Sequence, residues 1–393
     1  MNGPLDGITV VALEQAVAAP FASRQLADLG ARVIKIERPL VGDFARGYDE
    51  TVRGMSSHFV WLNRSKESLT LDVKQVEGAE ILRRLVADAD VFIHNLAPGA
   101  VDRLGFGAAR LRAAHPRLIV CGISGYGTSG PYRDKKAYDL LAQCEAGLVS
   151  ITGSPSEPAK VGVSVADIAA GVYAYSGVLT ALYQRERTGE GTSLDVSLFD
   201  ALGEWMGYPA YFTAYGGTPP PRAGASHATI APYGPFTASD GLQINLGVQN
   251  EREWRAFCAV ALEQPALADD PRFATNSLRV ANRSALHTLI DEAFATITSD
   301  ALVERLERAQ IAYARMNDMM SFWNHPQLRE RARWRSVGSP VGDLQALVPP
   351  VGMEGMESRM DPIPDVGEHT DAILRALGYA DARIKALRAA RVI

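Results

Sequence analysis

The chain has 393 residues, of which 47% are hydrophobic and 22% are charged, and its formal net charge is −5. This length exceeds that of one compact core, so two domains are expected. The acidic balance argues against a nucleic-acid-binding protein, which would carry a basic excess. We find no run of ~20 apolar residues for a membrane span, and the start lacks the features of a signal peptide. We therefore expect a globular, cytoplasmic protein without a nucleic-acid or membrane partner.

The first 125 residues alternate between strand and helix patterns. Apolar runs typical of buried strands end in charged or polar residues, and amphipathic segments of helical period separate them. The strands are expected at 8–14, 32–38, 68–73, 90–96 and 117–124, and the helices at 20–31 and 76–89. Further helices are expected at 139–149 and 164–187. This alternation predicts an α/β fold with a doubly wound, Rossmann-like parallel sheet.

The pattern changes near residue 215. Residues 215–226 are rich in Gly and Pro, as at a domain boundary. Beyond them, Asp240-Gly241 separates two apolar runs within 233–247 and predicts a β-hairpin. The sequence is irregular at about 320–365 and helical from 367 to 393. We predict a large α/β domain at 1–215, a linker and smaller α+β domain at 216–325, and a connector and helices at 326–393 that return to the large domain.

Several common chemistries lack their motifs. The turn after the first strand, "EQAVAAPF" at 14–21, has no glycine, whereas a dinucleotide fingerprint needs three. No phosphate-binding loop occurs, the seven histidines form no metal-binding pair, and "GISGYG" at 122–127 lacks the glycine pattern of a nucleophile elbow around Ser124. Nicotinamide, nucleoside triphosphate, metal and serine-hydrolase chemistry are therefore not supported.

Asp167 is the only charged residue of "VGVSVADIAAGVYAYSG" at 161–177. An Asp in the first turn of a helix often stabilises the free backbone N–H groups there. The alternative is a catalytic nucleophile, which the same helix end would keep ionised. The small residues Ala166, Ala169, Ala170 and Gly171 would let a substrate or another helix approach closely. These residues alone leave both interpretations open.

Four basic residues follow predicted strands, namely Arg38, Lys74, Arg103 and Lys136. Ligands of doubly wound sheets bind at the carboxyl ends of the strands. Taken singly, each residue is better explained as solvated surface charge. Taken together, the four cations would suit a ligand with several phosphates as well as they suit a solvated surface.

Eight segments occur in the order found in one known family. Among them are "ADLGARVIKIERPLVGDFARG" at 27–47, "NLAPGAVDRLGF" at 95–106, "SVADIAAG" at 164–171 and "VGEHTDAILRALGY" at 366–379. Over about residues 5–380 the chain resembles the class III CoA-transferases, a superfamily that includes formyl-CoA transferase, carnitine CoA-transferase and α-methylacyl-CoA racemase. The resemblance implies an interlocked homodimer whose large domain is built from both ends of the chain.

The resemblance also implies an acyl-CoA:carboxylate CoA-transferase in which Asp167 carries the acyl group. The CoA thioester is a substrate, and neither a permanently bound cofactor nor a metal is implied. The positions that grip CoA in the family match Gln15, Ala16, Arg38, Leu71, Lys74, Asn95, Leu96, Arg103, Leu104 and Lys136. All four basic residues noted above are among them, which favours the nucleophile interpretation of Asp167. Backbone N–H groups near Gln15 and Ala16 are expected to hold the thioester oxyanion.

Three positions depart from the family pattern. The racemases have His immediately before the aspartate at position 139, whereas this chain has Tyr138. Formyl-CoA transferase has Glu where this chain has Asp139, and it closes a run of glycines over its nucleophile where this chain offers only Gly247. Asp139, Tyr138, Gly247 and Gln15 are therefore candidates for catalytic support.

The segment "HNLAPGAVDRLG" at 94–105 resembles family members that use succinyl-CoA with dicarboxylic acids such as itaconate, malate, mesaconate or citramalate. Arg46, Arg222 and His227 are candidates for binding the distal carboxylate, or are packing residues. A racemase or isomerase of the same fold, and a non-catalytic CoA-binding protein, are the alternatives.

Overall fold

The computed structural model describes residues 3–393, which divide into two compact units. The large unit comprises the chain through Ala146, Gly162–Met206 and Leu328–Ile393. The small unit comprises Gly147–Val161 and Gly207–Gln327. The segment 147–161 thus packs with the small unit, although the sequence assigned it to the large domain. This segment contacts the small unit, because the Gly153 carbonyl accepts a hydrogen bond from the Gly224 N–H, and the local sequence pattern does not indicate that contact.

A six-stranded parallel sheet forms the centre of the large unit, in the order β3-β2-β1-β4-β5-β6. Its strands are β1 (Thr9–Leu13), β2 (Arg32–Glu37), β3 (Lys66–Thr70), β4 (Val91–His94), β5 (Ile119–Ser124) and β6 (Ser193–Ser197). The predicted parallel sheet is confirmed, but β6 was not predicted. It is an edge strand of sequence SLDVS, partly exposed, and therefore lacks the apolar run of a buried strand.

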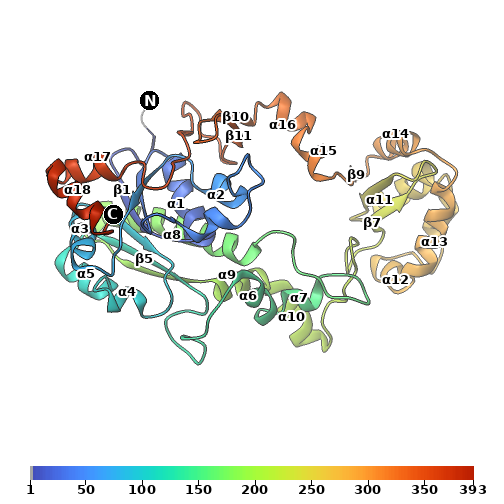
Figure 1. Ribbon diagram of the computed structural model, residues 1–393. Coiled ribbons are helices and arrows are strands. Elements are labelled where there is room, and N and C mark those ends of the chain that lie inside the picture. Colours follow the sequence, from blue (N-terminus) through green and yellow to red (C-terminus); the bar gives the residue numbers. More distant parts are fainter. Residues whose placement is uncertain (1–2) are drawn as a thin grey trace. The chain divides into compact units, whose positions relative to one another are not determined.

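Helices cover both faces of this sheet (Figure 1). The core on one face joins Val11, Phe92 and Val120 of the strands to α3, α17 and α18, so the end of the sequence does return to the large unit. On the other face, α8 packs along α1 and against β5 and β6. The helices of this unit are α1 (Ala18–Asp28), α2 (Ser57–Leu62), α3 (Val76–Ala87), α4 (Ala100–Arg103), α5 (Ala108–Ala114), α6 (Asp139–Glu145), α8 (Val165–Thr188), α9 (Leu198–Trp205), α17 (Thr370–Ala376) and α18 (Asp381–Ala389), with the 3-10 turn η1 (Phe44–Gly47).

Two details of the helices differ from expectation. The helix expected over 139–149 is two helices, α6 and α7 (Leu148–Ile151), because Gly147 adopts a left-handed conformation between them. Helix α8 is long and apolar enough to cross a membrane. The core helix of a globular protein meets the same criterion, and α8 packs against α1, β5 and β6 as such a helix does. The cytoplasmic location stays a prediction.

Helices α1 and α8 approach each other unusually closely at Gly171. A Cβ atom on Gly171 would lie 2.7 Å from the Ala18 carbonyl oxygen, so only glycine fits there. Ala166, Ala169 and Ala170 are fully buried. The small residues on both sides of Asp167 therefore allow the approach of a helix, and this contact joins the first part of α8 to the first turn of α1.

The small unit contains a three-stranded antiparallel sheet in the order β7-β8-β9. Its first two strands form the hairpin predicted at Asp240-Gly241, and Trp254, Phe257 and Phe294 lie in the core beside it. The elements are α10 (Gly207–Gly216), β7 (Tyr233–Thr237), β8 (Gln243–Gly247), α11 (Glu251–Ala256), the π-helix η2 (Phe257–Ala261), the 3-10 turn η3 (Pro265–Asp269), α12 (Asn276–Ala281), α13 (Arg283–Phe294), α14 (Ser299–Ala309), β9 (Ala312–Arg315) and α15 (Met319–Trp323). The connector that follows holds α16 (Pro326–Glu330) and the hairpin β10 (Trp334–Val337) and β11 (Leu344–Leu347).

Candidate active site

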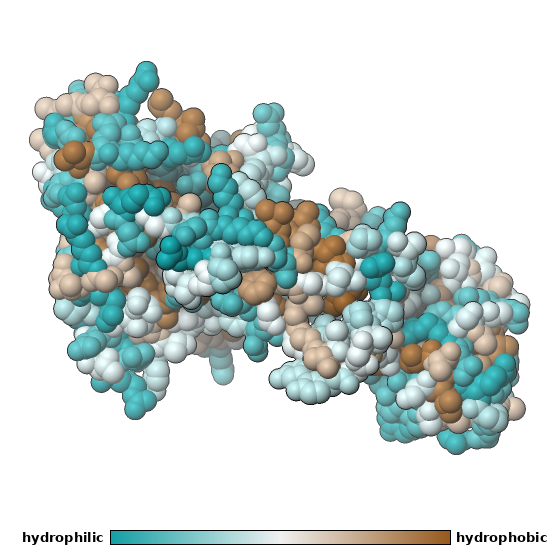
Figure 2. Space-filling model, turned by 90° about the horizontal axis from the view of Figure 1, so that it is seen from below, coloured by the Kyte–Doolittle hydropathy of each residue, from teal (hydrophilic) through white to brown (hydrophobic). Residues whose placement is uncertain are grey.

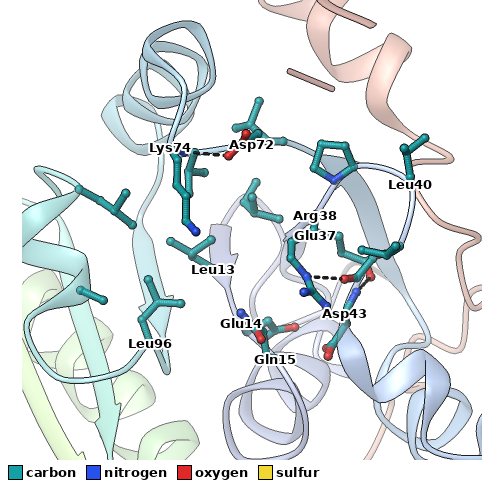
Figure 3. Close-up of a pocket in the computed structure, with 18 of the residues that line it drawn as sticks. Leu13, Glu14, Gln15, Glu37, Arg38, Leu40, Asp43, Asp72, Lys74 and Leu96 are labelled. Carbon is teal, nitrogen blue, oxygen red and sulfur yellow. Dashed lines mark hydrogen bonds between the residues drawn. The ribbon is translucent and has the colours of Figure 1, made fainter. Parts of the chain in front are cut away.

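A cavity of about 640 Å³ lies at the carboxyl ends of β1, β2 and β3. Six of the ten residues expected to contact CoA line it: Gln15, Arg38, Leu71, Lys74, Leu96 and Leu104. Figure 3 shows the Lys74 side chain extending from its loop toward Leu13, at the end of β1. We call this space the first cavity. Charged residues of both signs line it, namely the cations Arg38, Lys74 and Arg391 and the carboxylates Glu14, Glu37, Asp43 and Asp72. The apolar walls and the cations suit a ligand with an alkyl arm and phosphates.

The cations of the first cavity are not neutralised by neighbours. Among residues 3–393, no carboxylate lies within 4 Å of the basic groups of Arg38, Lys74 or Arg391. Arg38 donates only to the Gly42 carbonyl, at 3.2 Å. Arg391 was not among the candidate residues, because no strand precedes it in the sequence.

A second cavity, of about 650 Å³, lies beside the ends of β4, β5 and β6. Arg103 lines it, and Leu96 lines both cavities. Lys136 is exposed and lines neither of them. Three of the four basic residues noted in the sequence thus reach a cavity at the expected edge of the sheet.

The turn between β1 and α1 is held by side chains from other strands. The Gln15 N–H donates to Asn95 Oδ1 at 2.9 Å, and Asn95 Nδ2 donates to the Gln15 carbonyl at 2.7 Å. Ala16 has a left-handed φ of 61°, and its N–H donates to Asp43 Oδ1 at 3.1 Å. Both N–H groups expected to hold the oxyanion are therefore already occupied. The Gln15 side-chain amide makes no hydrogen bond within the described chain, so it remains able to donate.

A network of buried charges lies behind this turn. The side chains of Glu14, Lys35 and Lys66 have no exposed surface. Lys66 Nζ lies 2.8 Å from Glu14 Oε1, while Lys35 Nζ lies 2.8 Å from Asp43 Oδ2 and 3.4 Å from Glu14 Oε1. Although burial opposes ionisation, the charges of Lys66 and Lys35 bring the pKa of Glu14 below its usual value. Lys35 thus fixes Asp43, which in turn fixes the backbone of Ala16.

Asp167 lies in the first turn of α8, and Asp139 of α6 binds the start of the same helix. Asp139 Oδ1 accepts hydrogen bonds from the Ala166 N–H at 2.7 Å and from the Asp167 N–H at 3.2 Å. Gln143 Nε2 donates to Asp139 Oδ2 at 2.6 Å. Asp139 therefore caps α8 from a neighbouring helix, and it takes the N–H groups that were expected to stabilise Asp167.

This arrangement raises the proton affinity of Asp167. Burial, and after it the negative charge of Asp139, raise the pKa of Asp167 to about 7. Asp139 therefore occupies the helix end that was expected to keep Asp167 ionised. Burial, and after it the charges of Asp43 and Asp167, also raise the pKa of Tyr48 to about 12. Tyr48 carries no motif and was missed in the sequence.

We expect the pH profile of kcat/KM to depend on Asp139. If ionised Asp167 attacks the substrate, kcat/KM should rise with pH and level off above an inflection near 7. Asp139→Asn removes the neighbouring charge while its amide oxygen can still cap α8, so the inflection should move to lower pH. Glu145→Gln, at the far end of α6, should leave it unchanged. An inflection that does not move in Asp139→Asn would contradict this electrostatic coupling.

The residues expected to bind the second carboxylate are engaged elsewhere. Arg46 forms a two-bond ion pair with Glu37, at 2.7 and 2.9 Å, and its guanidinium lies 3.6 Å from the Phe59 ring centre. Arg222 donates to three backbone carbonyls, those of Ser150, Ser154 and Pro155. The His227 ring stacks on Tyr233. These contacts are typical of structural residues.

Two further candidates for catalytic support, Tyr138 and Gly247, lie in different units. Tyr138 has a side chain 70% exposed and stands at the position before α6, in the large unit. Gly247 ends β8 in the small unit, where its neighbour is the Tyr233 ring. Gln15, Asp139, Tyr138 and Asp167 thus belong to the large unit, whereas Gly247, Arg222 and His227 belong to the small one.

Comparison with known proteins gives the family. A family profile described as CoA-transferase family III matches residues 5–370, and the chain belongs to this family. It is 33% identical to succinyl-CoA:glutarate CoA-transferase of Homo sapiens over 395 residues, covering 99% of this chain and 90% of that protein. It is 34% identical to succinate–glutarate CoA-transferase of Agrobacterium fabrum over 384 residues, covering 95% and 96%. The crystal structure of a CAIB/BAIF family protein from Brucella suis is 36% identical with a TM-score of 0.84, covering 96% of this chain and 100% of that one. The expected enzyme class, an acyl-CoA:carboxylate CoA-transferase, is confirmed.

Proposed function

We propose that this enzyme moves CoA from succinyl-CoA to another small dicarboxylic acid through covalent intermediates on Asp167. The proposal rests on one observation, the unpaired position and raised pKa of the Asp167 carboxylate. It lies at the start of α8 with no basic group within 4 Å among the described residues, and its pKa is raised to about 7. A carboxylate whose conjugate acid has a near-neutral pKa is a better nucleophile than an ordinary one, yet it is still half ionised at pH 7.

The reaction proceeds in four exchanges. A carboxylate oxygen of Asp167 attacks the donor thioester carbonyl and expels CoA thiolate, which leaves a mixed anhydride on the enzyme. The thiolate attacks the aspartyl carbonyl of that anhydride, forms an aspartyl-CoA thioester and releases the donor acid. The acceptor carboxylate attacks this thioester, expelling CoA thiolate and forming a second anhydride. The thiolate then attacks the acceptor carbonyl, which yields the new acyl-CoA and frees Asp167.

The protein groups around the carboxylate have distinct roles. The first cavity holds the CoA part of the substrate, with Arg38 and Lys74 as cations for its phosphates. Arg103, in the second cavity, supplies a further cation. The free side-chain amide of Gln15 donates to the oxyanion of each tetrahedral intermediate. Because water would hydrolyse the anhydrides, the burial that raises the pKa of Asp167 also protects them.

The acid class is proposed from two sources. The segment at 94–105 resembles members that use itaconate, malate, mesaconate or citramalate, and curated relatives are named for glutarate, mesaconate, D-citramalate and L-malate. The test is a panel of acyl-CoA donors against mono- and dicarboxylic acids, with each new acyl-CoA identified by mass. We expect the highest kcat/KM for succinyl-CoA with a four- or five-carbon dicarboxylate. Preference for monocarboxylic acids would contradict the acid class but not the enzyme class.

The racemase alternative is disfavoured by Tyr138. The racemases have an imidazole before the aspartate, which titrates near neutral pH and exchanges an α-proton, and this chain has no imidazole at that position. The same reaction mixtures in deuterated water should therefore show no deuterium at the α-carbon of 2-methylacyl-CoA on the timescale of transfer.

We also propose that two chains interlock as a homodimer. Large apolar side chains are exposed on both units, including Leu141 and Tyr183 of the large unit and Tyr211 and Met319 of the small unit. Figure 2 shows exposed hydrophobic groups among the hydrophilic ones on the side that it presents. Covering exposed apolar area is typical of permanent interfaces. The dimer should persist at low nanomolar concentration in sedimentation, because interlocked chains cannot separate without unfolding. Folded monomer at micromolar concentration would rule out interlocking.

A further inference from the structure

Arg391, which follows α18, has a strained backbone conformation. Arg391 has a φ of 56°, in the left-handed region where glycine is favoured. It occupies the position after the Ala390 cap of α18, and the Val392 N–H donates to the Leu387 carbonyl at 2.9 Å while the Arg391 N–H donates to the Arg388 carbonyl at 3.0 Å. This pair of bonds is the Schellman arrangement, whose left-handed residue is usually glycine. An arginine here adds strain that glycine would avoid.

Backbone contacts fix Arg391 beside the loop that carries Lys74. The Asp72 N–H donates to the Val392 carbonyl at 2.7 Å, and Gln75 Nε2 donates to the Arg391 carbonyl at 3.2 Å. Val392 is 1% exposed and packs in the core of the large unit. Arg391 and Lys74 therefore lie on the same wall of the first cavity, next to β3.

The guanidinium of Arg391 has no anionic partner in the part of the chain that the structure describes. By contrast, Arg388, three residues earlier, pairs with Asp371 of α17, and Arg375 pairs with Asp381. Gln15 lies on the β1 side of the cavity, three residues before Ala18, whose carbonyl lies against Gly171 of α8. A thioester that reaches toward Asp167 from that side leaves its nucleotide phosphates toward β3.

We propose that Arg391 is a phosphate-binding residue of the CoA site and contacts the nucleotide phosphates of CoA together with Lys74. This inference rests on the proposed function of the first cavity as the CoA site. It explains why an unpaired arginine stands where the local backbone favours glycine.

The test uses Arg391→Gly, which suits the left-handed backbone and removes only the side chain. We expect its unfolding temperature to equal or exceed that of the wild type, while its Kd for free CoA, measured by calorimetry, rises about tenfold. Its Kd should also depend less on ionic strength, because one phosphate contact is lost. Arg391→Lys should recover most of the affinity, since lysine also binds phosphate.

Arg388→Ala is the matched control. It removes a guanidinium from the same end of α18, but this guanidinium is already paired with Asp371. It should bind CoA as the wild type does. If Arg391→Gly remains folded and binds CoA as tightly as the wild type, the inference is wrong while the proposed function stands. If the wild type and Arg388→Ala themselves fail to bind CoA, the proposed function fails with it.

Discussion

Asp167→Asn is expected to reduce CoA transfer by more than about a thousandfold while leaving CoA binding unchanged. The amide cannot form the anhydride or the aspartyl thioester, whereas Arg38 and Lys74, the proposed phosphate ligands, line the first cavity and are unchanged. In the wild type, incubation with the acyl-CoA donor followed by borohydride should convert Asp167 to the alcohol, which mass spectrometry of the peptide containing it detects. Asp139→Asn should keep this label. Modification of another residue, or turnover without any label, would contradict the mechanism.

Asp167→Asn should also stabilise the fold. Because folding raises the pKa of Asp167 from 3.8 to about 7, the ionised form is less favourable in the folded state than in the unfolded chain. This cost is absent below the unfolded pKa and grows as pH rises to about 7. The shift sets an upper limit of about 4 kcal/mol, and partial exposure reduces the expected gain to about 1–3 kcal/mol. Denaturant unfolding of Asp167→Asn should show the gain at pH 8 and none at pH 3.

Glu14→Gln is expected to destabilise the large unit by about 3–5 kcal/mol, the largest stability effect that we predict. Glu14 is 1% exposed and accepts hydrogen bonds from Lys66, Lys35 and Ser23. Removing its charge leaves Lys66 buried without a carboxylate, since its remaining partners are the Pro20 carbonyl and the Asn63 amide oxygen. The free energy of unfolding in urea measures the effect.

Glu67→Gln provides the control for this measurement. Glu67 pairs with Arg32 at 2.8 Å on the surface, where the same loss of charge should cost no more than about 1 kcal/mol. Equal losses in the two variants would show that burial of the Glu14 network adds nothing to stability.

The sequence predicted those features of the site that depend on local pattern. Apolar runs followed by a cation placed Arg38 and Lys74 at the ends of β2 and β3, and both line the first cavity. Asp167 stood out because its neighbours are uncharged. Strand β6 was missed, since an edge strand needs no continuous apolar run.

The features that sequence could not predict depend on contacts between distant segments. Asp139 and Asp167 lie on different helices. Only the packing of α6 against α8 brings the Asp139 carboxylate to the first N–H groups of α8, the helix that carries Asp167. The N–H groups of Gln15 and Ala16 are occupied by Asn95 and Asp43, which come from other loops. Arg391 reaches the cavity only because α18 packs back onto the sheet. No local pattern records these contacts.

The turn between β1 and α1 has a consequence for how this enzyme can diverge. Its sheet has the strand order of dinucleotide-binding folds. Those folds bind phosphate with backbone N–H groups that a substitution cannot remove, whereas here Asn95 and Asp43 occupy the corresponding groups. In the CoA site that we propose, phosphate recognition is left to side chains on separate loops, and each can be gained or lost by one substitution without disturbing the turn. Under the proposed function, a single cation of the CoA site can therefore change while the turn and the buried charges that support it stay the same.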